Sequence, residues 1–140
     1  MKEIKMELPA DFNFVPGIRN CLAHFAYSFG FNDKEAYHIQ TIVDEICNNA
    51  IEHGSKGRNA KIFITCRFKK AHIELLVKDN NGTNFNVKDI FRRNLKLLET
   101  NPYRRGKGLI IVQRLVNKLD IKVGKKGTTV KIVKKAGAYN

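Results

Sequence analysis

A carboxylate and a carboxamide lie one helical turn apart near the middle of this chain of 140 residues. Glu45 and Asn49 are four residues apart, so in a helix their side chains stack on one face. Beside that face, apolar residues repeat at helical spacing and predict a buried stripe. The stripe consists of Ile39, Ile42, Val43, Ile46 and Ala50. Polar groups at the edge of a core need partners, and a bound metal or ligand is one such partner. Taken alone, the segment is better explained as an ordinary amphipathic helix with a hydrated border.

Three short segments, which occur in a fixed order, indicate a functional role for this helix. Residues 45–54 follow the pattern Glu-x-x-x-Asn-Ala-x-x-His-Gly, residues 105–110 read Arg-Gly-Lys-Gly-Leu-Ile, and residues 127–132 read Gly-Thr-Thr-Val-Lys-Ile. They resemble the N-box, the glycine box that closes the nucleotide lid, and the closing Gly-Thr strand of the GHKL (histidine-kinase-like) ATPases. The resemblance runs from about Leu8 to Lys134. Among the GHKL branches, this short form most resembles the bacterial anti-sigma-factor serine/threonine kinases.

The resemblance implies ATP and Mg²⁺ as cofactors and gives roles to particular residues. Glu45 would be the catalytic base that accepts the proton of a serine hydroxyl during phosphoryl transfer. Asn49 would bind Mg²⁺ through its amide oxygen, since magnesium usually takes few ligands from the protein. Gly106 and Gly108 would let backbone N–H groups approach phosphate oxygens at the start of a helix, with Arg105 beside them.

The adenine site is where the chain departs from the family pattern. The family's first glycine box is Asp-x-Gly, whereas Gly82 comes three residues after Asp79. Either one residue is inserted and Asp79 keeps the hydrogen bond to the adenine amino group, or Asn80 replaces it as an uncharged acceptor. We predict Asp79 for this role, together with Gly82, and a water-mediated adenine contact for Thr128. A degenerate site that no longer binds nucleotide is the alternative.

The elements that must position these residues are read from periodicity. The order is strand, helix, helix, strand, strand, a lid at about 86–107, helix, strand, strand. Strands are expected at 4–8, 62–68, 73–77, 120–123 and 128–133, and helices at 16–29, 33–54 and 108–119. Asn32 and Glu35 fit a capping box at the start of the second helix. Strands joined in hairpins favour an α/β (α+β) fold, a two-layer sandwich of a mixed, mostly antiparallel sheet with helices on one face. This is also the GHKL (Bergerat) fold, and we expect one domain over residues 1–140.

Composition limits the class of protein. The formal net charge of +13 invites an acidic protein, polyphosphate or nucleic acid as partner. The basic residues are dispersed, however, and no zinc-finger spacing or arginine-rich repeat organises them, so a nucleic-acid-binding domain ranks well below the other hypotheses. The three cysteines show no metal-ligand spacing. No signal peptide or membrane-spanning run is apparent, so we expect a cytoplasmic protein without membrane contact.

The function implied by the resemblance is that of an ATP-binding anti-sigma factor and serine/threonine protein kinase. Its partners would be a sigma factor or similar regulator, which it binds, and an anti-anti-sigma (STAS-type) protein, which it phosphorylates. The family also implies a homodimer. The alternative is a non-kinase GHKL switch protein that regulates a phosphatase or other partner by binding, with a degenerate nucleotide site.

Overall fold

The computed structural model describes residues 1–54, 59–80, 108–124 and 127–137, apart from the side chains of residues 53 and 54. Within these ranges the elements follow the predicted order. They are strand β1 (Lys2–Pro9), helices α1 (Val15–Ser28) and α2 (Asp33–Asn49), strands β2 (Lys61–Lys69) and β3 (His72–Asp79), helix α4 (Gly108–Leu115), and strands β4 (Lys118–Gly124) and β5 (Gly127–Lys135). A 3-10 turn (Phe12–Phe14) precedes α1, and a π turn (Ala50–Gly54) follows α2. The lid expected at about 86–107 lies outside the described residues.

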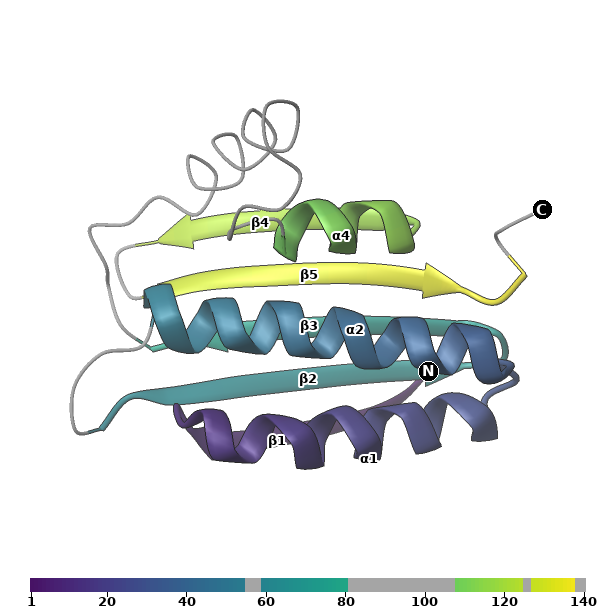
Figure 1. Ribbon diagram of the computed structural model, residues 1–140, viewed down its shortest axis with the longest axis horizontal. Coiled ribbons are helices and arrows are strands. Elements are labelled where there is room, and N and C mark those ends of the chain that lie inside the picture. Colours follow the sequence, from purple (N-terminus) through teal and green to yellow (C-terminus); the bar gives the residue numbers. More distant parts are fainter. Residues whose placement is uncertain (55–58, 81–107, 125–126, 138–140) are drawn as a thin grey trace.

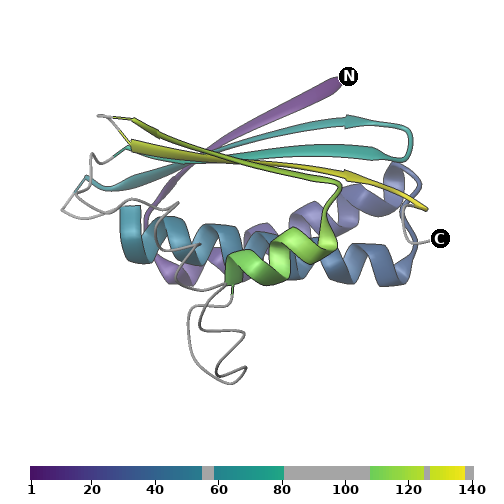
Figure 2. The same cartoon turned by 90° about the horizontal axis from the view of Figure 1, so that it is seen from above.

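The strands form one five-stranded sheet in the order β1-β2-β3-β5-β4. Every pairing among the described strands is antiparallel, so the predicted sheet is confirmed in its antiparallel form. Antiparallel neighbours can be joined by short turns, as β2–β3 and β4–β5 are. Helices α1, α2 and α4 all lie on the same face of the sheet (Figures 1 and 2). The predicted two-layer α+β sandwich is therefore the observed fold.

The core lies between the helices and the covered face of the sheet. Alternate residues of β2 are buried, namely Ile62, Ile64, Cys66 and Phe68, as the period of a half-buried strand requires. The predicted stripe of α2 faces them, and Ile42, Val43 and Ile46 are almost fully buried. Burying one such side chain stabilises the fold by roughly 1.5–3 kcal/mol. In the described part of the chain, no helix combines the length and the apolar character that crossing a membrane requires.

The helix ends follow from local sequence. Asn32 accepts a hydrogen bond from the backbone N–H of Glu35 at 2.8 Å, and Glu35 accepts one from that of Asn32 at 3.0 Å. The predicted capping box is confirmed. Pro16 lies in the first turn of α1, where its missing N–H costs nothing. Gly30 ends that helix with a φ of +96°, a conformation that side chains with a Cβ rarely adopt.

The helix that begins at Gly108 is shorter than its apolar pattern suggested. It ends at Leu115, and Leu119, the last residue of the expected helix, lies in β4 opposite Ile132. The buried residues of this helix are Leu109, Ile110 and Val112, whereas Ile111 is exposed. An apolar residue suits a helix stripe and a strand equally well. Pairing with β5 decided the outcome for Leu119.

Candidate functional site

The candidate site lies where the C-terminal end of α2 meets the end of the sheet at which β3 stops and β5 starts (Figure 1). Asn49 is the last residue of α2, and Glu45 lies one turn before it. The π turn that follows packs against β3 and β5, and its Ile51 is buried. A π turn holds one more residue in each hydrogen-bonded ring than an α-helix, and such turns are frequent at functional sites. The turn ties the end of α2 to both strands of the site.

Glu45 lies against the start of α4. A Cβ atom added to Gly108 would overlap the Oε2 atom of Glu45 and would lie 3.1 Å from its Cδ atom. Only glycine therefore leaves the carboxylate where it is. Burial is the larger cause that raises the pKa of Glu45, and the neighbouring carboxylate of Asp44 is the smaller one. A half-buried carboxyl group with a raised pKa is suited to accept a proton near neutral pH.

Asn49 is half-buried at the same helix end. Among the residues that the structure describes, neither Asn49 nor Glu45 forms a side-chain hydrogen bond. No group of three or more His, Cys, Asp or Glu side chains in the described ranges could hold a metal ion. A cation at Asn49 would therefore depend on one amide oxygen and on ligands from outside the protein. Magnesium commonly binds in that way.

Asp79 closes the other side of the site. It is the last residue of β3 and is only 2% exposed. The backbone N–H of Thr128 donates to both of its carboxylate oxygens at 3.4 Å. Gly127 precedes Thr128 with a φ of +141°, and a Cβ atom there would lie 2.9 Å from the Oδ1 atom of Asp79. The glycine thus lets the start of β5 approach the carboxylate closely.

The two residues proposed for the adenine contact point in different directions. Asp79 shares the covered face of the sheet with Val77, because side chains alternate along β3. Asn80 is exposed, and its side chain is used locally: it accepts the backbone N–H of Lys61 at 3.0 Å and donates to the carbonyl of Asn59 at 3.2 Å. This geometry favours Asp79 over Asn80, although the role itself stays a prediction.

Several predicted site residues fall outside the described ranges. Gly82, Arg105 and Gly106 are among them, as is the expected lid. The structure does bring Glu45 against Gly108, with Asn49 one turn further along α2, and it joins Asp79 to Thr128 at the end of the sheet. The π turn connects the two groups.

One polar contact beside the site was not foreseen. Arg19 of α1 donates to the Oδ2 atom of Asp44 at 2.8 Å, next to Glu45 in the chain. The Oδ1 atom of Asp44 is buried and accepts no hydrogen bond from the described residues. The two partners are separated by 25 positions, and nothing in the local pattern of either helix links them. Only the packing of α1 on α2 shows that they meet.

Comparisons with known proteins find relatives that match almost the whole chain. The chain is 26% identical to a serine-protein kinase RsbW of Bacillus pumilus, over 94% of this chain and 84% of that protein. It is 27% identical to the serine-protein kinase RsbW of a Bacillus thuringiensis strain, over 95% of this chain and 84% of that protein.

Two solved structures share the fold. The RsbU and RsbW domains of a Mycobacterium tuberculosis protein match with a TM-score of 0.68 at 18% identity, covering 96% of this chain but 32% of that one. The catalytic domain of the histidine kinase ThkA matches with a TM-score of 0.53 at 16% identity, covering 96% and 97%. The model of the histidine kinase-like ATPase domain family matches residues 8–134, nearly the whole chain. The chain therefore belongs to the histidine kinase-like ATPase domain family.

Proposed function

We propose that this chain is a cytoplasmic, ATP-binding anti-sigma factor and serine/threonine protein kinase that acts on an anti-anti-sigma (STAS-type) partner. It would bind a sigma factor or similar regulator through its surface. The observation that carries the proposal is the contact between the carboxylate of Glu45 and Gly108 at the start of α4, with Asn49 one turn further along α2. The names of the relatives at 26–27% identity support the same conclusion.

The residues divide the work of phosphoryl transfer. Glu45, whose pKa is raised by burial, would accept the proton of the attacking serine hydroxyl. Backbone N–H groups at the start of α4 would face the phosphates, since a helix N-terminus favours anions and Gly108 carries no side chain to block approach. Mg-ATP, with Mg²⁺ held by the amide oxygen of Asn49, would supply the phosphoryl group and neutralise its charge.

The adenine end of the nucleotide would lie at Asp79 and Thr128. The carboxylate of Asp79 accepts the N–H of Thr128, and an ionised carboxylate can accept several hydrogen bonds at once, including one from an amino group. Its burial keeps competing water away, which strengthens a hydrogen bond there. The hydroxyl of Thr128 would reach the base through a water molecule.

Phosphotransfer from labelled ATP to purified STAS-domain proteins tests the proposal. The variant Glu45→Gln removes the base and keeps the shape of the side chain. We expect transfer to slow by at least roughly 100-fold, the usual contribution of a general base, with ATP affinity retained. Glu7→Gln, on the opposite face of the sheet, is the matched control and should transfer normally. Transfer at an undiminished rate by Glu45→Gln would remove Glu45 from the mechanism.

The second candidate is the non-kinase switch protein. The irregular spacing between Asp79 and Gly82 favours it, because a displaced glycine can disturb the adenine site. A thermal-shift titration with Mg-ATP separates the two functions. Ligand that binds only the native state stabilises it, by about 2.7 kcal/mol at a concentration of about 100 times Kd. A rise in Tm that Asn49→Ala abolishes supports the kinase, whereas the absence of any shift supports the switch protein. Sedimentation of the same samples tests the expected homodimer.

A further inference from the structure

The face of the sheet opposite the helices is uncovered in the part of the chain that the structure describes (Figure 2). Alternate residues of every strand point to it. The registers of the four pairings align these residues in rows that run across all five strands. We call this surface the open face. Its rows differ in chemistry, and the difference indicates what the surface binds.

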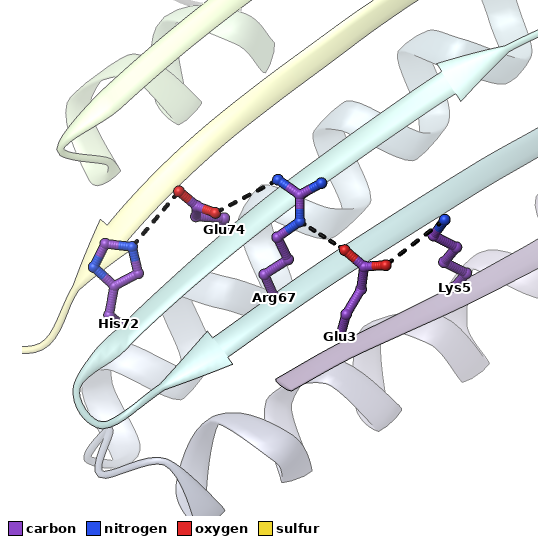
Figure 3. Close-up of polar contacts among 5 residues, drawn as sticks. All are labelled: Glu3, Lys5, Arg67, His72 and Glu74. Carbon is purple, nitrogen blue, oxygen red and sulfur yellow. Dashed lines mark hydrogen bonds and ion pairs between the residues drawn. The ribbon is translucent and has the colours of Figure 1, made fainter. Parts of the chain in front are cut away.

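The part of the open face around Arg67 is neutralised by its own ion pairs. Arg67 donates to Glu3 at 2.7 Å and lies 3.9 Å from Glu74, while Lys5 lies 3.7 Å from Glu3 (Figure 3). The hydrogen bond from Arg67 lowers the pKa of Glu3, so that carboxylate stays charged. Burial is the main cause that lowers the pKa of His72, which weakens the ionic character of its 3.9 Å contact with Glu74. Positive and negative groups alternate here and leave little surplus charge for a partner.

A row closer to the end of the sheet that carries Asp79 is different. From β1 to β4 it consists of Glu7, Phe63, Lys78, Thr129 and Lys122. Glu7 is already paired with Lys61 at 2.7 Å. Lys78 and Lys122 are exposed, and neither has an ion-pair partner among the described residues. Phe63 is 36% exposed, which is a large apolar side chain to leave in water.

The adjacent row extends this surface. It consists of Lys5, Thr65, Leu76, Lys131 and Asp120. A groove of about 730 Å³ crosses the two rows on the β1–β3 side, with Phe63, Thr65, Lys5 and Lys78 among its lining residues. The centre of these two rows thus carries apolar and threonine side chains, whereas lysines outnumber carboxylates at the border. The surface is complementary to a chain segment that is negative and carries an apolar side chain.

We propose that the open face docks an acidic protein segment, with an apolar side chain of that segment packed on Phe63 and its carboxylates paired with Lys78 and Lys122. This inference goes beyond the proposed kinase and does not need its activity. Each pairing uses a lysine that the described part of the chain leaves unpaired. The apolar contact would shield these lysine–carboxylate pairs from water. Such pairs attract more strongly than ion pairs that are exposed to water.

The same rows argue against nucleic acid as the occupant. Glu7 and Asp120 stand in the rows with the lysines. A phosphate backbone carries a charge at every nucleotide and could not avoid these two carboxylates, whereas a peptide can place its carboxylates at the lysines only. Among the described residues of these two rows, Phe63 alone offers an aromatic ring, whereas single strands are usually bound by stacking several bases on aromatic side chains. A protein segment can meet both signs of charge and one ring.

Amide NMR on the full chain tests the proposal with a synthetic acidic peptide that alternates Glu and Leu. We expect shifts at Phe63, Thr65, Lys78 and Thr129. The double variant Lys78→Glu/Lys122→Glu should raise Kd at least about tenfold, and Phe63→Ser should raise it by a similar factor. The matched control is Lys2→Glu/Lys70→Glu, which makes the same change of charge away from the two rows. It should leave Kd within about twofold of the original.

Three outcomes would overturn the proposal. Equal weakening by the control pair would mean that net charge alone attracts the peptide. Tighter binding of a single-stranded oligonucleotide of equal charge, with shifts on the same rows, would assign the open face to nucleic acid. Dissociation of a dimer by Phe63→Ser, measured by sedimentation, would assign it to a second copy of the chain. Circular dichroism and Tm of each variant exclude loss of folding as the cause.

Discussion

One lysine is buried in the sandwich. Because of it, we expect the free energy of unfolding of this protein to change with pH in the alkaline range. Lys134 is only 1% exposed, on the covered face of β5. Its ammonium group donates to the carbonyl of Leu115, the last residue of α4, at 2.7 Å. A cation is favourable at a helix C-terminus, but burial of charge is costly. Burial lowers the pKa of Lys134 from 10.5 to about 8, and the nearby carboxylate of Glu35 opposes that change.

The magnitude follows from linkage. At neutral pH the charged side chain costs about 3 kcal/mol, the free energy that corresponds to lowering the pKa from 10.5 to about 8. The unfolded chain keeps this proton up to its ordinary pKa, whereas the folded chain releases it earlier. Between these two pKa values the unfolded state binds more protons, so the free energy of unfolding rises with pH. About 2 kcal/mol of the cost should be recovered between about pH 7 and about pH 9.5.

Urea unfolding at these two pH values measures the effect against Lys134→Met. Replacing the lysine removes the titration and leaves a side chain of similar length. The original protein should gain about 2 kcal/mol relative to this variant on going to the higher pH. Lys131→Met, on the open face of the same strand, is the control, and its free energy of unfolding should change between the two pH values as that of the original protein does. If the free energy of unfolding of Lys134→Met also changes by the same amount, within about 0.5 kcal/mol, the argument from burial is refuted.

Three further predictions concern the site and the helix ends. Gly127→Ala should destabilise the fold by about 2 kcal/mol in urea unfolding, because its φ of +141° and the adjoining carbonyl exclude a Cβ atom. Gly17→Ala, in a helix with open space around it, should instead stabilise by about 0.5 kcal/mol. Carboxyl NMR should show that Asp44→Asn moves the titration of Glu45 to lower pH, since the Asp44 charge helps raise that pKa; an unmoved or upward titration would contradict this. Asn32→Ala should cost about 1 kcal/mol by removing the cap of α2, and a loss below about 0.3 kcal/mol would mean that the cap contributes little.

Local rules account for the parts of the fold that the sequence predicted well. The capping box at Asn32 and Glu35 and the apolar stripe of α2 each depend on residues within a few positions of one another. The alternation in β2 likewise needs only one buried face. Such patterns can be recognised without knowing which element packs against the segment, because the periods of helices and strands differ.

The helix boundary that was predicted wrongly, and the choice of residue that the sequence left open, both depend on segments far away in the chain. Leu119 entered a strand because β5 lies beside it, although its apolar side chain also fitted a helix. The preference for Asp79 over Asn80 rests on the sheet: Asp79 ends β3 on its covered face, whereas Asn80 follows the strand and is exposed. Neither result can be read from neighbouring residues, since a shift of one position exchanges the two faces of a strand.

The amino-acid sequence by itself determined the order of elements, the capped start of α2 and the spacing of Glu45 and Asn49, because these are properties of the local backbone and its period. Tertiary structure alone decided that Glu45 lies on Gly108, that Asp79 receives the N–H of Thr128, and that Lys134 is buried. Each of these contacts joins segments brought together only when the sheet and helices pack. Burial and charge environment are set at that step and not before.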